Sequence, residues 1–315
     1  MPEPERLQSY TESMCAVLIV VLAGVHSQET SIGQALQRLS EEAEIFVRVA
    51  PKVIGQEIMK QKARRPPPRF RPRIGKDAHQ PPPARYQTRE IVSEYGYSAF
   101  QESPESLHEF RQVVSVDGRK ILNTAKASRL LVMGVSTADD KLKHKLLRDF
   151  EKFGLHGAAT DLAPMLLLFT RRQLDNYTFA LEGKERIGAD SALRISYAQK
   201  AGVAAVTLFT GRQATRLPLQ GHIWVREEDS LPLRISLAVS TLEEDKRFSR
   251  TATIDYRLSS HGVLLPVSVS YLEQGEGATT VENQFSYEGW RMFKVDAELK
   301  FTFEEPAPAP APVKR

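Results

Sequence analysis

The chain has 315 residues, with 43 Lys and Arg against 39 Asp and Glu, 41% hydrophobic residues and a single Cys. This composition is typical of a globular protein, and it excludes a collagen-like, mucin-like or wholly disordered chain. The net charge of +4 is small for a dedicated nucleic-acid-binding protein, so we expect no nucleic-acid partner. The length accommodates one large domain or two smaller ones, with a core that needs neither disulfides nor metal.

An uncharged apolar run, MCAVLIVVLAGV at 14–25, lies near the N-terminus. It is shorter than the roughly 20 residues that a membrane-spanning helix needs, and it suits the hydrophobic region of a secretory signal peptide. Val25 and Ser27 are small residues in the positions expected before a cut at Gln28. We therefore predict a cleaved signal peptide at 1–27 and a periplasmic or secreted protein. A buried first helix and a membrane anchor are the alternatives.

Apolar residues from Ile32 to Ile54 recur every three or four positions, which predicts an N-terminal helix over 28–62 that Pro51 kinks or divides. The following stretch, 62–85, holds eight Lys or Arg and seven Pro but one Asp. Such a segment cannot pack a core, so we predict an extended, basic, Pro-rich linker at 63–85. It is either a stiff spacer or a basic arm for an anionic membrane surface or a partner groove.

The region after residue 85 is dominated by alternation of apolar and polar residues, the pattern of strands with one buried face. Phe293 to Phe303 alternates without interruption and predicts one continuous strand. In all, ten or eleven strands are expected, at 86–99, 107–116, 177–182, 192–198, 203–210, 221–226, 233–239, 252–258, 263–271, 280–287 and 293–303.

A helical insert is predicted at 137–172, between the second and third of these strands. Thr137 and Asp140 make a plausible cap for a first helix, whose Lys-rich face suits a solvated surface. A second, strongly apolar helix is expected to begin near Thr160 and to include Met165 to Phe169. The tail at 304–315, EEPAPAPAPVKR, is of low complexity and is predicted to be disordered.

The widths of these elements predict the fold class. Ten strands about 4.8 Å apart form a sheet about 48 Å wide, whereas one helix covers only about 10 to 12 Å. We therefore predict an α+β fold, a curved antiparallel half-barrel with helices in its concave mouth. Its apolar interior is either a cavity suited to acyl chains or a fully packed core.

Several short motifs carry a family resemblance: GHIWV at 221–225, PLRI at 232–235, IDY at 254–256, GVLLPV at 262–267 and RMFKVDAELKF at 291–301. They resemble the periplasmic outer-membrane lipoprotein-sorting family, which includes lipoprotein carriers and related envelope-stress sensors. The resemblance covers about residues 86–303. It implies a half-barrel domain over 86–303, closed by helices, that binds acyl chains or a lipoprotein in its concave face.

The sequence contains no motif for metal, nucleotide or cofactor chemistry. No HExxH, Walker loop, GxGxxG after a strand, or GxSxG occurs. The single Cys15 lies in the predicted signal peptide, which excludes thiolate sites from a mature chain. We therefore expect no enzyme, metal or cofactor. A hydrolase centred on His108 or His222 is the catalytic alternative.

The leading hypothesis is a non-catalytic exported protein that carries or senses a lipid or a lipidated partner. The alternative is an envelope sensor or adaptor that uses the basic linker to bind a protein or an anionic surface. The candidate ligand-binding residues are the apolar residues on the predicted inward face of the strands, with residues of the second helix as a lid. The lid residues are Met165, Leu168 and Phe169, and the wall residues are Val225, Leu233, Ile235, Tyr256, Leu265, Val267 and Phe293.

Overall fold

The computed structural model describes residues 31–65, 84–155, 162–202, 206–210, 213–243, 246–295 and 301–303. The predicted signal peptide at 1–27, the tail at 304–315 and most of the predicted linker lie outside the described residues. Within those ranges, no helix has both the length and the apolar character that crossing a membrane requires.

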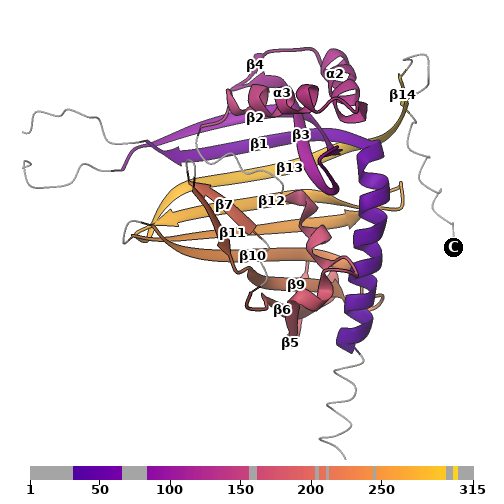
Figure 1. Cartoon of the computed structure of the whole chain (residues 1–315), viewed down its shortest axis with the longest axis vertical. Helices are drawn as coiled ribbons and strands as arrows, with labels where there is room; N and C mark the ends of the chain where they lie inside the picture. Colours follow the sequence, from indigo (N-terminus) through magenta and orange to yellow (C-terminus); the bar gives the residue numbers. More distant parts are fainter. Residues whose placement is uncertain are drawn as a thin grey trace, which may run out of the picture.

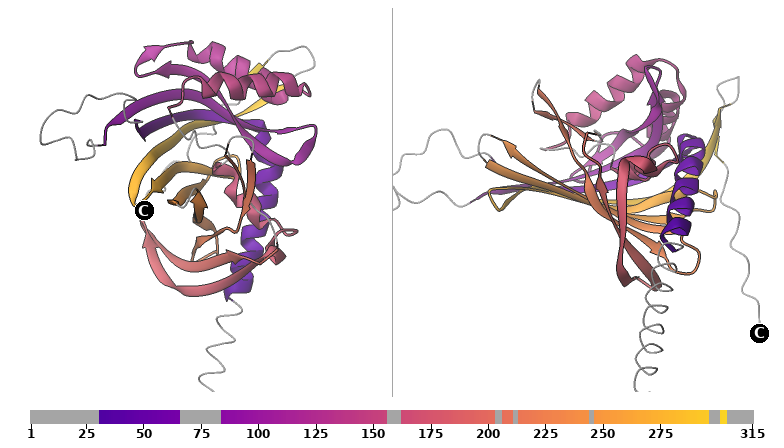
Figure 2. Two further views of the ribbon diagram at one scale, coloured as in Figure 1. Left: turned by 60° about the vertical axis from the view of Figure 1, so that its left-hand side comes forward. Right: turned by 60° about the horizontal axis from the view of Figure 1, so that its bottom comes forward.

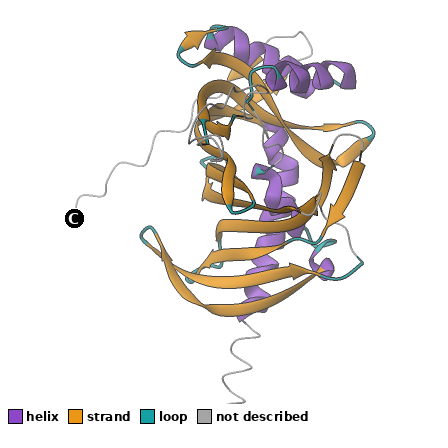
Figure 3. Ribbon diagram, turned by 90° about the vertical axis from the view of Figure 1, so that its left-hand side faces the viewer, coloured by secondary structure: helices purple, strands orange, loops and turns teal. Residues whose placement is uncertain are grey.

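An open, curved antiparallel sheet forms the body of the molecule (Figures 1 and 3). Its strands follow the order β4-β3-β2-β1-β13-β12-β11-β10-β9-β6-β5, with β14 paired to β13. Because β4 and β5 end this path, the sheet is not closed. The predicted fold class is therefore confirmed: an α+β fold built on a curved antiparallel half-barrel.

The strand bounds agree well with the alternation in the second half of the chain. The strands are β1 (Val53–Arg64), β2 (Tyr86–Phe100), β3 (Ser103–Val116), β4 (Arg119–Lys120), β5 (Tyr177–Ile187), β6 (Asp190–Gln199), β9 (Gln220–Arg226), β10 (Pro232–Glu243), β11 (Lys246–Leu258), β12 (Leu264–Gly275), β13 (Ala278–Val295) and β14 (Phe301–Phe303). A separate hairpin consists of β7 (Val206–Thr210) and β8 (Gln213–Leu217).

Helices cover both faces of the sheet (Figure 2). A helix over residues 31–49 runs along the concave face and ends in η1 (Ala50–Lys52), and η3 (Ala163–Phe169) and η4 (Leu174–Asn176) follow on that side. The helices α2 (Thr124–Ser136) and α3 (Asp140–Glu151) pack against β2 and β3 from the opposite face. The N-terminal helix and η3 thus lie in the predicted concave mouth, whereas α3, the first helix of the predicted insert, packs on the opposite face.

The prediction of a helix through residue 62 is wrong, because residues 53–64 form β1 between β13 and β2. Pro51 lies in the short turn η1, where its ring ends the helix. Beyond it, Glu57 and Gln61 occupy positions of β1 that face the core and are buried. These two polar residues on the buried face hide the alternation that normally marks a strand.

The predicted domain boundary at 63–85 is also wrong. Arg64 of β1 pairs with Tyr86 of β2, and the Arg65 backbone N–H donates to the Arg85 carbonyl at 2.7 Å. The Pro-rich stretch therefore connects two paired strands of one sheet, and the half-barrel includes residues before 86. Proline composition did not indicate that the strands on either side of this stretch pair with each other.

Two further expectations need correction. The continuous strand at 293–303 is a hairpin in which Phe293 of β13 pairs with Phe303 of β14, since alternation reports the face of a residue and not the continuity of its strand. The helix α2, which was not predicted, ends at Ser136 just before the predicted insert at 137–172, and α3 begins with Asp139, not Thr137, as its N-cap. The second predicted helix is the 3-10 helix η3.

Candidate functional site

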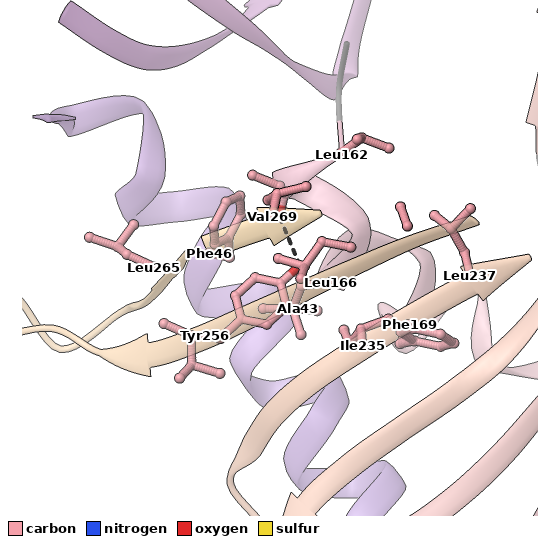
Figure 4. Packing of buried hydrophobic residues seen from close by; sticks show 14 of the residues in the cluster. Ala43, Phe46, Leu162, Leu166, Phe169, Ile235, Leu237, Tyr256, Leu265 and Val269 are labelled. Carbon is pink, nitrogen blue, oxygen red and sulfur yellow. Dashed lines mark hydrogen bonds between the residues drawn. The ribbon is translucent and has the colours of Figure 1, made fainter. Parts of the chain in front are cut away.

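The concave face is packed with apolar side chains from the sheet and its helical cover (Figure 4). Phe46 from the N-terminal helix and Leu166 from η3 lie in one cluster with Ile235 of β10 and Val269 of β12. The Tyr256 hydroxyl donates to the Ala163 carbonyl at 2.8 Å and so joins β11 to η3. Burial raises the pKa of this Tyr256 hydroxyl well above its usual value, so it stays a donor.

The structure brings most of the predicted ligand-binding residues together in this cluster. Val225, Ile235, Leu265 and Phe169 are at most 1% exposed, and Met165 and Leu168 pack against them while only partly buried. Phe293 lies apart, in the second apolar cluster beneath α2 and α3. The alternation of apolar residues therefore identified positions that face the core. The role of these residues in binding a ligand stays a prediction.

Three predicted residues, Leu233, Tyr256 and Val267, line a pocket at one end of β10, β11 and β12. Its volume is about 440 Å³, within the range common for small-molecule sites. Ile187, Leu231 and Leu258 add apolar surface, and Leu258 is 47% exposed. We call this feature the bulge pocket.

Two β-bulges shape the bulge pocket. On β10, Pro232 pairs with Val225 and Arg234 with Trp224, which leaves Leu233 as an extra residue. On the other side of β11, Asp255 pairs with Ser268 and Tyr256 with Pro266, which leaves Val267 as an extra residue of β12. Bulges bend a strand and redirect its side chains, and they are frequent beside binding sites. Val267 is accordingly half-buried, although Leu265 and Val269 on either side are buried.

Charged side chains form the rim of the bulge pocket. Arg234 contacts Asp255 at 2.5 Å, and Arg226 contacts Asp190 at 3.3 Å, so these two guanidinium groups are neutralised. Arg257 is exposed and makes no ion pair with any residue that the structure describes. An apolar floor beside an uncompensated guanidinium suits a ligand with an apolar chain and an anionic head.

A second, larger groove of about 660 Å³ lies over β5, β6, β9, β10 and β11. Most of its lining residues are small or hydroxylated, such as Ala180, Ser196 and Thr253. At one side, His222 Nε2 lies 3.3 Å from Glu182 Oε2, and the Trp224 indole donates to Glu185 at 2.9 Å. The sequence pointed to His222 as a candidate but did not indicate that it lines a groove.

The other candidate histidine, His108, stacks at a tilt against Phe100, with 5.0 Å between the ring centroids. His108 does not line the described grooves and pockets. In the part of the chain that the structure describes, no three His, Cys, Asp or Glu side chains are grouped so that they could hold a metal ion.

The solved structures that are similar to this chain include the following two. One is a DUF1329 family protein from Desulfovibrio piger, with 11% identity and a TM-score of 0.31, over 84% of this chain and 92% of that one. The other is a domain from Vibrio parahaemolyticus described as outer-membrane lipoprotein-sorting, with 8% identity and a TM-score of 0.31, over 82% of this chain and 91% of that one. No family model and no curated protein matches the sequence.

Proposed function

We propose that the protein is a non-catalytic, exported binding protein that holds an anionic amphiphile, either a lipid or the lipid group of a lipidated partner, in the bulge pocket. The observation that carries this proposal is the meeting of Leu233, Val267 and Arg257 at one site. Val267 exposes part of its side chain at its bulge, Leu233 is a buried bulge residue in the pocket wall, and Arg257 offers an uncompensated positive charge.

The apolar part of the ligand lies against Leu233, Leu258 and Val267 in this proposal. Each methylene group that leaves water there contributes about 0.8 kcal/mol, so a short stretch of acyl chain supplies useful affinity. The anionic head is placed at Arg257, where a charge-assisted hydrogen bond adds orientation. Residues deeper in the concave face, such as Ile235, support the pocket from behind.

Export is part of the proposal and rests on the apolar run at 14–25, whose length suits a signal peptide. A binding role at an envelope membrane gives an exported protein access to amphiphiles. The family resemblance of the motifs PLRI and GVLLPV is consistent with this role, and these motifs contain the bulge residues Leu233 and Val267.

The test has two steps. Protein is first purified from an exporting host without detergent, and an organic extract is analysed by mass spectrometry for a stoichiometric amphiphile. Delipidated protein is then titrated with monoacyl phosphatidylglycerol. Val267→Asp places a carboxylate in the pocket and is expected to weaken binding about tenfold or more, as the loss of a buried apolar side chain predicts.

Leu242→Asp is the matched control, because Leu242 is 70% exposed on β10 and does not line the pocket. Far-UV circular dichroism establishes that both variants are folded. The proposal is contradicted if folded Val267→Asp binds like the wild type, or if Leu242→Asp loses binding equally. An Ile235→Asp variant is unsuitable, because Ile235 is fully buried and its replacement disrupts the core.

A further inference from the structure

The two helices on the outer face of the sheet present an apolar surface to solvent. Ile121, Leu130, Met133 and Leu142 are 41%, 37%, 44% and 43% exposed. They make up four of the seven large hydrophobic residues exposed in the described part of the chain. Single exposed apolar residues are ordinary, but a concentration within 22 residues of sequence marks an interaction surface.

The helices α2 and α3 lie on the outside of the sheet, next to β2 and β3 (Figure 1). Leu131, Val135 and Leu146 fill the inner side, where they contact Ile54 and Phe110 of the sheet. The helix repeat then places Lys126, Arg129, Leu130 and Met133 of α2 in one outward stripe, at spacings of three and four. We call the outward side of the two helices, with Ile121, the α2–α3 surface.

Positive charge surrounds the exposed apolar residues. Residues 119–152 contain nine Lys or Arg and four Asp or Glu, an excess of five, whereas the excess over the whole chain is four. Lys126, Arg129 and Lys141 make no ion pair with a described residue. The segment with α2 and α3 is therefore a basic part of the chain, as is the Pro-rich stretch 62–85 with its eight Lys or Arg and one Asp.

The acids in the same segment have local structural roles. Asp139 caps α3 by accepting from the Lys141 backbone N–H, and Asp140 accepts from the Gln101 backbone N–H at 2.9 Å. Asp149 pairs with Lys152 at 2.6 Å. These partners occupy three of the four carboxylates, so they offer little compensation to the cations on α2.

We propose that the α2–α3 surface docks on an anionic phospholipid membrane. Lys126, Arg129 and Lys141 attract the headgroups, and Leu130, Met133 and Leu142 enter the interface between headgroups and acyl chains. A helix face that combines basic residues with exposed Leu and Met has the chemistry of an interfacial membrane anchor. The charge complementarity selects the anionic lipid surface as the partner.

This inference is independent of the bulge pocket, which lies on β10, β11 and β12, whereas α2 and α3 pack on β2 and β3. Loss of ligand binding and loss of membrane docking can thus be measured separately. The test is flotation of the full chain with vesicles of phosphatidylcholine alone and with vesicles that contain phosphatidylglycerol.

Wild-type protein is expected to bind better to the anionic vesicles, with a preference that falls as salt is raised. Each removed cation is expected to lower that preference about fivefold, from the usual contribution of a Lys or Arg near an anionic leaflet. The double variant Lys126→Gln with Arg129→Gln removes two of these cations. The matched control is Lys200→Gln with Arg247→Gln, the same charge change at two exposed positions outside both helices.

Leu130→Ser tests the apolar contribution and is compared with Leu242→Ser, a substitution at the 70% exposed position on β10. The first is expected to weaken vesicle binding roughly threefold to tenfold, and the second is expected to leave it unchanged. All six residues that change on the helices and in the controls are exposed, so folding is expected to be preserved. The proposal is overturned if the helix variants keep the preference for anionic vesicles, if the controls lose it equally, or if only a protein partner binds this face.

Discussion

Leu233 on β10 and Val267 on β12 are the extra residues of two β-bulges, and each directly follows a proline, Pro232 or Pro266. A proline has no N–H for the ladder, so in an interior strand it is confined to strand ends and irregular positions such as bulges. The two bulges lie on opposite sides of β11, and their extra side chains meet in one pocket. Backbone irregularity thus creates the opening in an otherwise regular sheet.

Arg257 is expected to confer selectivity for an anionic head. Arg257→Gln should lower the affinity for monoacyl phosphatidylglycerol about tenfold, the lower end of what a charged hydrogen bond contributes, and should leave monoacyl phosphatidylcholine binding unchanged. Isothermal titration with the two lipids measures the difference. Arg247→Gln, an exposed site near the other end of β11, is the control. If Arg257→Gln keeps the wild-type preference for phosphatidylglycerol over phosphatidylcholine, the anionic head does not bind at Arg257.

Tyr256 is expected to hold η3 on the sheet. The Tyr256→Phe variant removes the donor to the Ala163 carbonyl and leaves that buried acceptor without its partner, at a cost of roughly 1–3 kcal/mol in the free energy of unfolding. Urea denaturation measures the loss. Hydrogen exchange should rise within η3 and less on β11, where the ladder is intact. Uniform exchange across both elements would show that the bond does not fasten η3 specifically.

Alternation was enough to predict the open antiparallel sheet after residue 85, because most of those strands bury one face and expose the other. It failed at β1, where Glu57 and Gln61 face the core and are buried. Glu57 is tolerated there because it receives two bonds from Arg111, at 2.7 and 2.8 Å. A buried ion pair depends on a partner 54 residues away in sequence, so no local pattern could have indicated it.

Local sequence patterns also did not predict the shape of the candidate site. Alternation selected Leu233 and Val267 as part of a regular wall with Ile235 and Leu265, but the bulges change the register there. Arg257 was not predicted, since a charged residue in an alternating strand is ordinary. The available signal was the presence of a proline in two interior strands, and it indicates a bulge without indicating which residues meet across it.

Arg111 is expected to be the most sensitive charged residue in the core. Its guanidinium lies between the carboxylates of Glu57 and Glu109, and Glu109 also accepts from the Ala163 backbone N–H at 2.7 Å. Although burial alone would lower the pKa of Arg111, the two carboxylates outweigh it and raise the pKa well above its usual value. Arg111→Met leaves two buried acids without their cation and should destabilise the protein by about 3–5 kcal/mol.

Chemical denaturation of Arg111→Met and of Arg194→Met separates a buried pair from an exposed one. Arg194 is 42% exposed and contacts Glu182 at 2.9 Å, so its replacement should change stability by about 0–1 kcal/mol. Equal losses in the two variants would contradict the role assigned to the buried cluster.

Glu42 is expected to make the packing of the N-terminal helix depend on pH. Its side chain is 1% exposed, and Arg38 Nη2 contacts Oε1 at 2.6 Å. Burial raises the pKa of Glu42 above its usual value of 4.5, Arg38 opposes this, and Glu41 and Asp229 add to it. An acid with a raised pKa in the folded state stabilises the fold most when protonated. Its contribution is therefore full below pH 4.5 and is lost as pH rises through the folded-state pKa.

Glu42→Gln keeps the shape of the side chain and removes this titration, so the difference in melting temperature between variant and wild type should grow in favour of the variant as pH rises from 4.5 to neutral. Thermal unfolding at several pH values measures it. Glu41→Gln is the control, because Glu41 is 38% exposed and lies 4.0 Å from Arg38. Parallel curves for wild type and Glu42→Gln would show that the buried carboxylate does not govern the pH dependence of this helix.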